Sequence, residues 1–79
     1  MTIKAITVLP DQELLIESED GRTGIFDVKP YMSLEAFAPL SDPSLFRAVK
    51  SAGYYIEWQC GADLSADTIE AHLKAKPAG

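Results

Sequence analysis

The sequence predicts an α+β fold: an antiparallel β-meander of three strands, short helices, a further strand or hairpin ending at Trp58, and a C-terminal helix. Three observations predict it. Asp20–Gly21 separates two runs of strand-forming residues, and this dipeptide favours a tight hairpin turn. The run from Tyr54 to Trp58 alternates with the period of a strand, and Ser65 is a typical helix N-cap.

The chain has 79 residues, which is enough for one domain, 1–79. A chain of this length buries only about 60–65% of the surface that its unfolded form exposes, so a packed core or a partner subunit has to supply its stability. The expected segments are the β-meander in 1–28, short helices in 33–47, a strand or hairpin in 48–58, and the C-terminal helix in 65–75.

The composition excludes several classes of partner. The net charge is −5 and the seven basic residues are scattered, so we expect no direct nucleic-acid binding by this domain alone. We also expect no signal peptide and no membrane span, which makes the cytoplasm the default location. One cysteine allows no internal disulfide, and no motif calls for a cofactor.

The first strand, Ile3–Leu9, is apolar on both faces, which is typical of a strand that is covered on both sides or central in its sheet. We expect Ile3, Ala5 and Leu9 on one face and Ile6 and Val8 on the other. Pro10–Asp11 provides a turn into the second strand, Gln12–Ser18. In that strand Leu14 and Ile16 point inward, Glu13 and Glu17 point outward, and Leu15 is an apolar exception on the outward face. Thr23–Val28 is the returning strand, and Pro30 ends the sheet.

The middle of the chain contains two helix starts. Ser33 is expected to cap a short helix that carries Leu34 and Phe37 and stops at Pro39. Asp42–Pro43 begins the next helix, whose apolar residues are Leu45, Phe46 and Val49. Residues 47–52 are open to two interpretations: the helix continues to Ala52, or a strand turns at Ala52–Gly53 into Tyr54–Trp58.

The last helix is the best marked. Ser65 is its N-cap, and Leu64 and Ile69 have the spacing of a hydrophobic staple. Ala66, Ile69 and Leu73 form its inward face, while Lys74 and Lys76 suit the negative end of the helix dipole. Residues 77–79 are expected to form a frayed tail.

The chemistry-bearing residues do not predict a catalytic or metal site. Cys60 and His72 could pair as nucleophile and base, but we favour a semi-buried thiol and a helix histidine that shares the stripe of Ile69 and Leu73. One cysteine and one histidine are too few for a zinc site, even with Asp63, Asp67 and Glu70 nearby. Glu13, Glu17, Glu19 and Asp20 are interpreted as a solvated face.

The aromatic run offers a binding hypothesis. Tyr54, Tyr55 and Trp58 cannot all point the same way, so one face is expected in the core and the other is open to an interface role. Ile6, Val8 and Leu15 are likewise expected to leave apolar area on the second face of the sheet. Tyr54, Trp58 and Asp63 are the candidate binding residues.

Three short motifs follow one another along the chain: Phe26-Asp-Val-Lys-Pro30, Leu40-Ser-Asp-Pro-Ser-Leu-Phe46 and Trp58-Gln-Cys-Gly-Ala-Asp-Leu64. Together they resemble elements of a bacterial family of domains of unknown function, family 2442. The last motif is similar to that family's Trp-Pro-Asn-Gly-Ala-Asp-Leu signature, with Gln59–Cys60 in place of Pro-Asn. The resemblance implies a small α+β fold, and Asp27 belongs to one of the matched elements. The residues themselves predict structural roles for Gly61 in a turn, for Asp63 in the loop, and for Leu64 with Ser65 at a helix start.

The resemblance implies no assigned reaction, and it implies relatives that occur alone, fused to a helix-turn-helix module, or beside small partner proteins in toxin–antitoxin-like arrangements. We expect a non-catalytic interaction or regulatory module that forms a homo-oligomer, such as a dimer, or binds a small partner protein. Because the strands are apolar on two faces and the core is small, self-association is expected through a sheet edge or an aromatic surface. The alternative is a small-molecule sensor with a pocket near Trp58 and Asp63, where Asp63 also fixes the loop before the last helix.

Overall fold

The computed structural model describes residues 1–75 and confirms the α+β fold, in which two antiparallel sheets carry the short helices. The first sheet has the order β1–β2–β3, with β1 (Ile3–Leu9), β2 (Glu13–Ser18) and β3 (Thr23–Asp27). The second has the order β4–β5–β6, with β4 (Lys50–Ser51), β5 (Tyr55–Glu57) and β6 (Asp63–Ser65). The helices are α1 (Pro43–Phe46) and α2 (Ala66–Ala71), and three 3₁₀ segments are η1 (Pro10–Gln12), η2 (Lys29–Tyr31) and η3 (Glu35–Ser41).

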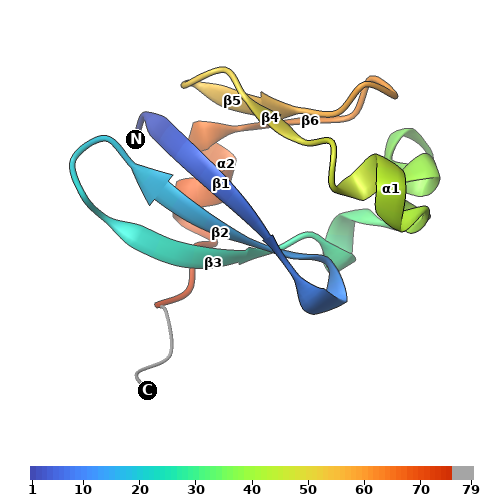
Figure 1. Cartoon of the computed structure of the whole chain (residues 1–79), viewed down its shortest axis with the longest axis horizontal. Coiled ribbons are helices and arrows are strands. Elements are labelled where there is room, and N and C mark those ends of the chain that lie inside the picture. Colours follow the sequence, from blue (N-terminus) through green and yellow to red (C-terminus); the bar gives the residue numbers. More distant parts are fainter. Residues whose placement is uncertain (76–79) are drawn as a thin grey trace.

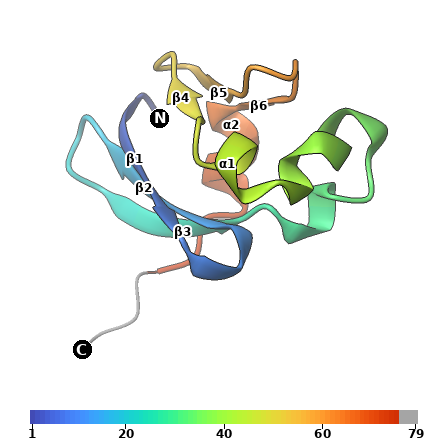
Figure 2. The ribbon, with the colours of Figure 1, turned by 45° about the vertical axis from the view of Figure 1, so that its right-hand side comes forward.

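Within residues 1–75, the first sheet is covered on one face only. The second sheet and both α-helices lie on the same side of it (Figure 1 and Figure 2). On that inner face Leu14, Ile16 and Phe26 are fully buried. On the opposite face the row formed by Thr7, Leu15 and Ile25 in register is exposed or only half-buried.

A β-bulge corrects the expected faces of β1. The pairing with β2 shifts between Ile3 and Ala5, so Ile3 joins Ile6 and Val8 on the inner face. Because a bulge adds one residue to one strand, every later residue of β1 changes face relative to Ile3. The apolar residues of the open face are therefore Ala5, Leu9, Leu15 and Ile25, whereas Ile6 and Val8 face the core.

A chain of aromatic contacts connects the two sheets. Ring centroids lie 5.7 Å apart for Phe26 and Tyr31, 5.8 Å for Tyr31 and Phe37, and 5.9 Å for Phe37 and Trp58. Phe46 stacks on Trp58 at 5.9 Å, and the indole N–H of Trp58 donates to the Phe46 carbonyl at 2.9 Å. Trp58 is thus a core residue with its polar atom satisfied, as buried tryptophans usually require.

The two helices predicted in the middle of the chain differ from the expectation in different ways. Ser33 caps nothing: the segment is the 3₁₀ helix η3, which contains Pro39 and leaves Leu34 exposed. The Asp42–Pro43 start is confirmed, since the Asp42 side chain accepts from the Ser44 N–H at 2.8 Å, but α1 has only one turn and Leu45 is exposed.

The open question at residues 47–52 is settled in favour of a strand. Lys50–Ser51 pairs antiparallel with β5 across the Ala52–Gly53 turn. The strand β6 was not predicted, because Asp63–Ser65 was interpreted as a turn and helix start. Its pairing with β5 gives the second sheet its third strand.

The last helix begins as predicted and ends earlier. The Ser65 hydroxyl accepts from the Thr68 N–H at 3.1 Å, and Leu64, Ala66 and Ile69 are buried. However, α2 ends at Ala71, and Lys74 bonds to Ile25 at the edge of β3 instead of continuing the helix to residue 75. Lys74 therefore does not sit on the helix end as predicted.

Glycine at position 24 permits this return of the chain to the sheet. A Cβ at Gly24 would lie 2.8 Å from the Lys74 carbonyl oxygen, closer than real Cβ atoms approach. Lys76 and the predicted tail at 77–79 lie outside the described residues. Within residues 1–75, neither α-helix has the length and apolar character that crossing a membrane requires.

The β2–β3 turn is fixed by an ionic network that reaches the last helix. Asp20 accepts from the Ser18 hydroxyl, from the Arg22 N–H at 3.1 Å and from Arg22 Nε at 2.8 Å. Arg22 Nη1 also donates to Glu70 at 3.0 Å, and Glu70 accepts from the N-terminal ammonium of Met1 at 2.7 Å. The Ser18 hydrogen bond, followed by those from Arg22, lowers the pKa of Asp20 to about 2.

This network predicts an acid-sensitive contribution to stability. A folded-state pKa below the ordinary value of 3.8 means that the stabilisation is complete above about pH 4 and is lost as the pH falls towards 2. We expect Asp20→Asn to lower the midpoint of urea unfolding at pH 7. Between pH 4 and pH 2 the midpoint of this variant should fall less steeply than that of the wild type. Glu19→Gln is the control, because no side-chain hydrogen bond of residues 1–75 involves Glu19. An equally steep decline in Asp20→Asn and Glu19→Gln would contradict this role.

Candidate functional site

The three residues predicted to bind a ligand do not converge. Trp58 is only 3% exposed, whereas Tyr54 is 76% exposed near the β4–β5 turn. Asp63 lies in β6 on the outer face of the second sheet, opposite Glu57. A hollow of about 350 Å³ does lie beside Trp58, but its lining includes neither Tyr54 nor Asp63: Ala48, Lys50, Glu57, Trp58, Gln59 and Gly61.

The residues that were expected to have structural roles differ in what they contact. Gly61 has φ +99° in the turn after Trp58, where the Trp58 N–H donates to the Ala62 carbonyl at 2.9 Å. Asp27 accepts from the Lys29 N–H at 2.9 Å and pairs with its ammonium at 3.0 Å. Asp63 does not fix the loop: its side chain is exposed and takes part in no hydrogen bond among residues 1–75, because backbone bonds already close the turn.

Cys60 and His72 are both exposed, which corrects the semi-buried thiol and the inward histidine expected from the sequence. The Cys60 thiol lies 3.9 Å from the Ala36 carbonyl, and His72 lines a separate hollow with Tyr31 and Lys74. Among residues 1–75, no three histidine, cysteine or carboxylate side chains are grouped so as to hold a metal ion.

The most distinctive feature outside these predictions is the outer edge of β1, and the hydrogen bonds of the first sheet show which groups point there. The Ser18 N–H donates to the Arg22 carbonyl at 2.8 Å, and the Val28 N–H donates to the Gln12 carbonyl at 3.0 Å. Even-numbered residues along β2 therefore bond towards β3. Because bonding direction alternates along an antiparallel strand, the odd-numbered residues of β2 bond towards β1.

The register then fixes the direction of the groups on β1. The odd-numbered residues of β2 lie opposite Ala5, Thr7 and Leu9, so these three bond inward to β2. The N–H and C=O groups of Ile6 and Val8 consequently point away from the sheet, and no element within residues 1–75 pairs with them. Two donors and two acceptors are presented in a row.

The middle of this edge lacks the usual protection against pairing. Charged residues, prolines and bulges are common guards of edge strands. In β1 these guards occur only at the two ends: Lys4 and the bulge precede Ala5, and Pro10 follows Leu9. The intervening segment, residues 5–9, is uncharged and rich in β-branched side chains.

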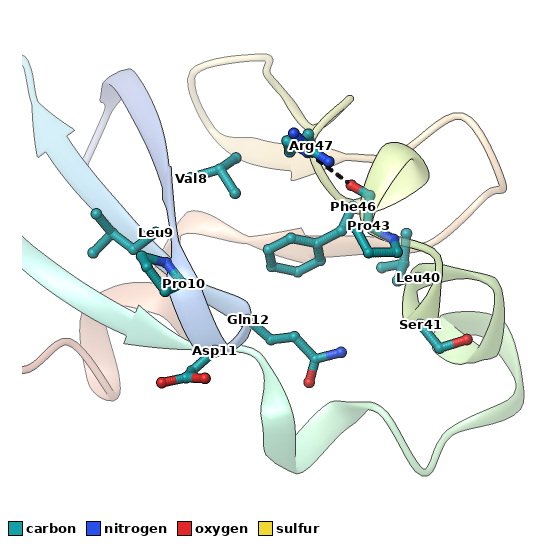
Figure 3. A pocket seen from close by; sticks show the side chains of 10 residues that line it. All are labelled: Val8, Leu9, Pro10, Asp11, Gln12, Leu40, Ser41, Pro43, Phe46 and Arg47. Atoms are coloured by element: carbon teal, nitrogen blue, oxygen red, sulfur yellow. Dashed lines mark hydrogen bonds between the residues drawn. The ribbon is translucent and has the colours of Figure 1, made fainter.

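A hollow of about 400 Å³ adjoins the end of this edge, between β1 and α1 (Figure 3). We call it the β1 pocket. Its lining residues are Val8, Leu9, Pro10, Asp11, Gln12, Leu40, Ser41, Pro43, Phe46 and Arg47. Phe46 and Leu40 are buried and form an apolar wall, whereas Asp11 and Arg47 are exposed charges at opposite sides of the opening in Figure 3.

The floor of the β1 pocket is a strained turn. Asp11 and Gln12 both adopt left-handed conformations, with φ 61° and φ 60°. Such a conformation costs a non-glycine residue roughly 1–2 kcal/mol. Two bonds hold the turn: Lys29 Nζ donates to the Asp11 carbonyl at 2.7 Å, and the Val28 N–H donates to the Gln12 carbonyl.

Sequence reasoning named a sheet edge as one route to self-association, but it did not identify the strand and it missed the pocket. The available signal was the uncharged run with two apolar faces that ends at Pro10. It was interpreted as a covered or central strand.

The strained turn predicts an unusual response to glycine. Gln12→Gly should raise the free energy of unfolding by about 0.5–1 kcal/mol, because glycine adopts positive φ without a steric cost. Glu13→Gly, one residue later at φ −109°, should lower it by a similar amount. Urea unfolding of the two variants measures both, and a loss of stability in Gln12→Gly would contradict the left-handed turn.

Comparisons with known proteins bear on the identity of the chain. Neither the curated proteins nor the solved structures include a match to it. A family model described as "Protein of unknown function (DUF2442)" matches residues 3–75, nearly the whole chain. The match confirms the resemblance seen in the motifs, and the chain belongs to the DUF2442 family.

Proposed function

We propose that this protein is an interaction module that binds an extended polypeptide segment by adding it as a strand to the outer edge of β1. One observation carries the proposal: Ile6 and Val8 present their N–H and C=O groups outward, with no partner among residues 1–75. Strand addition uses such groups for affinity and uses neighbouring pockets for side-chain specificity.

The surroundings of the edge support the same function. The β1 pocket begins at Val8 and Leu9, where a side chain of an added strand would enter. On the open face of the first sheet, Leu9 and Leu15 add apolar surface beside the same edge. An added strand would therefore bond to β1 and extend both faces of the sheet.

A synthetic peptide with the sequence of residues 3–11 tests strand addition. In ¹⁵N-labelled protein, the peptide should shift the amide signals of Ile6 and Val8 and slow their hydrogen exchange. Val8→Pro should abolish binding without breaking the β1–β2 ladder, because the missing N–H points outward.

Thr23→Pro is the matched control. Thr23 lies on β3, the other outer strand of the sheet. Its N–H also points outward, because Ile25, two residues later, exchanges hydrogen bonds with Lys74 outside the sheet and bonding direction repeats every second residue. Binding should persist in this variant. Peptide binding that is unaffected by Val8→Pro, or shifts confined to β3, would refute the proposal.

A further inference from the structure

The alternation of bonds along β1 restricts which strand can pair with it. In an antiparallel ladder, an outward-pointing residue must face an outward-pointing residue of the added strand. The open part of β1 contains two such residues, Ile6 and Val8. Below them the edge is already occupied, since the Ile3 N–H donates to the Gly53 carbonyl at 2.7 Å and the Ile3 carbonyl accepts from Ser51 Oγ at 2.9 Å.

A second copy of β1 satisfies this restriction when the two strands are related by a two-fold axis at Thr7. Ile6 of one copy then faces Val8 of the other, and Val8 faces Ile6. These two pairs exchange four hydrogen bonds and leave no outward group of Ile6 or Val8 unpaired. The two Thr7 side chains form the central pair without backbone bonds, and threonine pairs are favourable neighbours across strands.

The charges beside the edge agree with this register. In this register Lys4 of one copy comes near the end of β1 in the other copy, where the carboxylate of Asp11 is exposed. Pro10 cannot donate a backbone hydrogen bond, so the ladder between the two copies ends at Pro10 of one copy and Lys4 of the other. The present partner of Lys4 is Glu17 at 3.8 Å, a contact between two exposed side chains that contributes little. If Lys4 leaves Glu17 and pairs with Asp11 of the other copy, the lost contact costs little free energy. The new pair forms only in this register and therefore favours it.

We infer that the strand added at β1 is that of a second copy of this chain, giving a two-fold dimer with Thr7 on the axis and one continuous sheet through both copies. The inference rests on the proposed function and names its partner. The dimer joins the two open sheet faces, which carry Ala5, Leu9 and Leu15 from each copy.

Introducing a charge of either sign at Thr7, on the axis, tests this dimer without changing the fold. Thr7 is exposed, so Thr7→Lys and Thr7→Glu should each fold as the wild type does. In the dimer each would place two like charges directly opposite, which should weaken self-association at least about tenfold. An equimolar mixture of the two variants should restore a dimer, because Lys then faces Glu. Thr23→Lys, on the outer strand away from the axis, should dimerise as the wild type does.

Sedimentation velocity measures these states. We expect the wild type to dimerise at protein concentrations up to about 1 mM, the range of weak association. A wild type that stays monomeric there, a Thr7→Lys variant that still dimerises, or a mixture that stays monomeric would overturn the inference. Binding of the residue 3–11 peptide distinguishes failure of the dimer from failure of the proposed function. If the protein stays monomeric but binds the peptide, only the dimer is refuted; if it stays monomeric and does not bind the peptide, strand addition is refuted as well.

Discussion

The aromatic contacts from Phe26 to Phe46 hold the two sheets of this small domain together. Trp58 is central to them, since its ring touches Phe37 and Phe46 and its N–H satisfies the Phe46 carbonyl. Loss of such a buried bond leaves a carbonyl without a partner, which typically costs about 1–3 kcal/mol. The aromatic residues thus determine where the second sheet and α1 can lie.

That arrangement also determines what is left open. All of the elements that follow β3 are drawn to the inner face of the first sheet, where Leu14, Ile16 and Phe26 are buried. The edge of β3 is closed by the return of Lys74, and the start of β1 is closed by Ser51 and Gly53. Among residues 1–75, no backbone group bonds to the outward N–H and C=O groups of Ile6 and Val8.

The sequence predicts the local features well and the long-range ones poorly. The turn at Asp20–Gly21 and the N-caps at Asp42 and Ser65 depend on adjacent residues, and all three are confirmed. The strand β6 and the end of α2 depend on partners far along the chain, so periodicity could not reveal them. Trp58 was rightly given a core role, and it does line a hollow, but Tyr54 and Asp63 do not join it there, because the register of the second sheet decides the exposure of these two side chains.

The central claim is that Ile6 and Val8 have backbone groups free for another strand, and hydrogen exchange of single amides tests it most directly. In dilute protein the account predicts slow exchange at Thr7, which bonds to β2, and fast exchange at Ile6 and Val8. At high protein concentration the amides of Ile6 and Val8 should slow selectively. Slow exchange at Ile6 and Val8 in dilute protein, or exchange independent of concentration, would contradict the account.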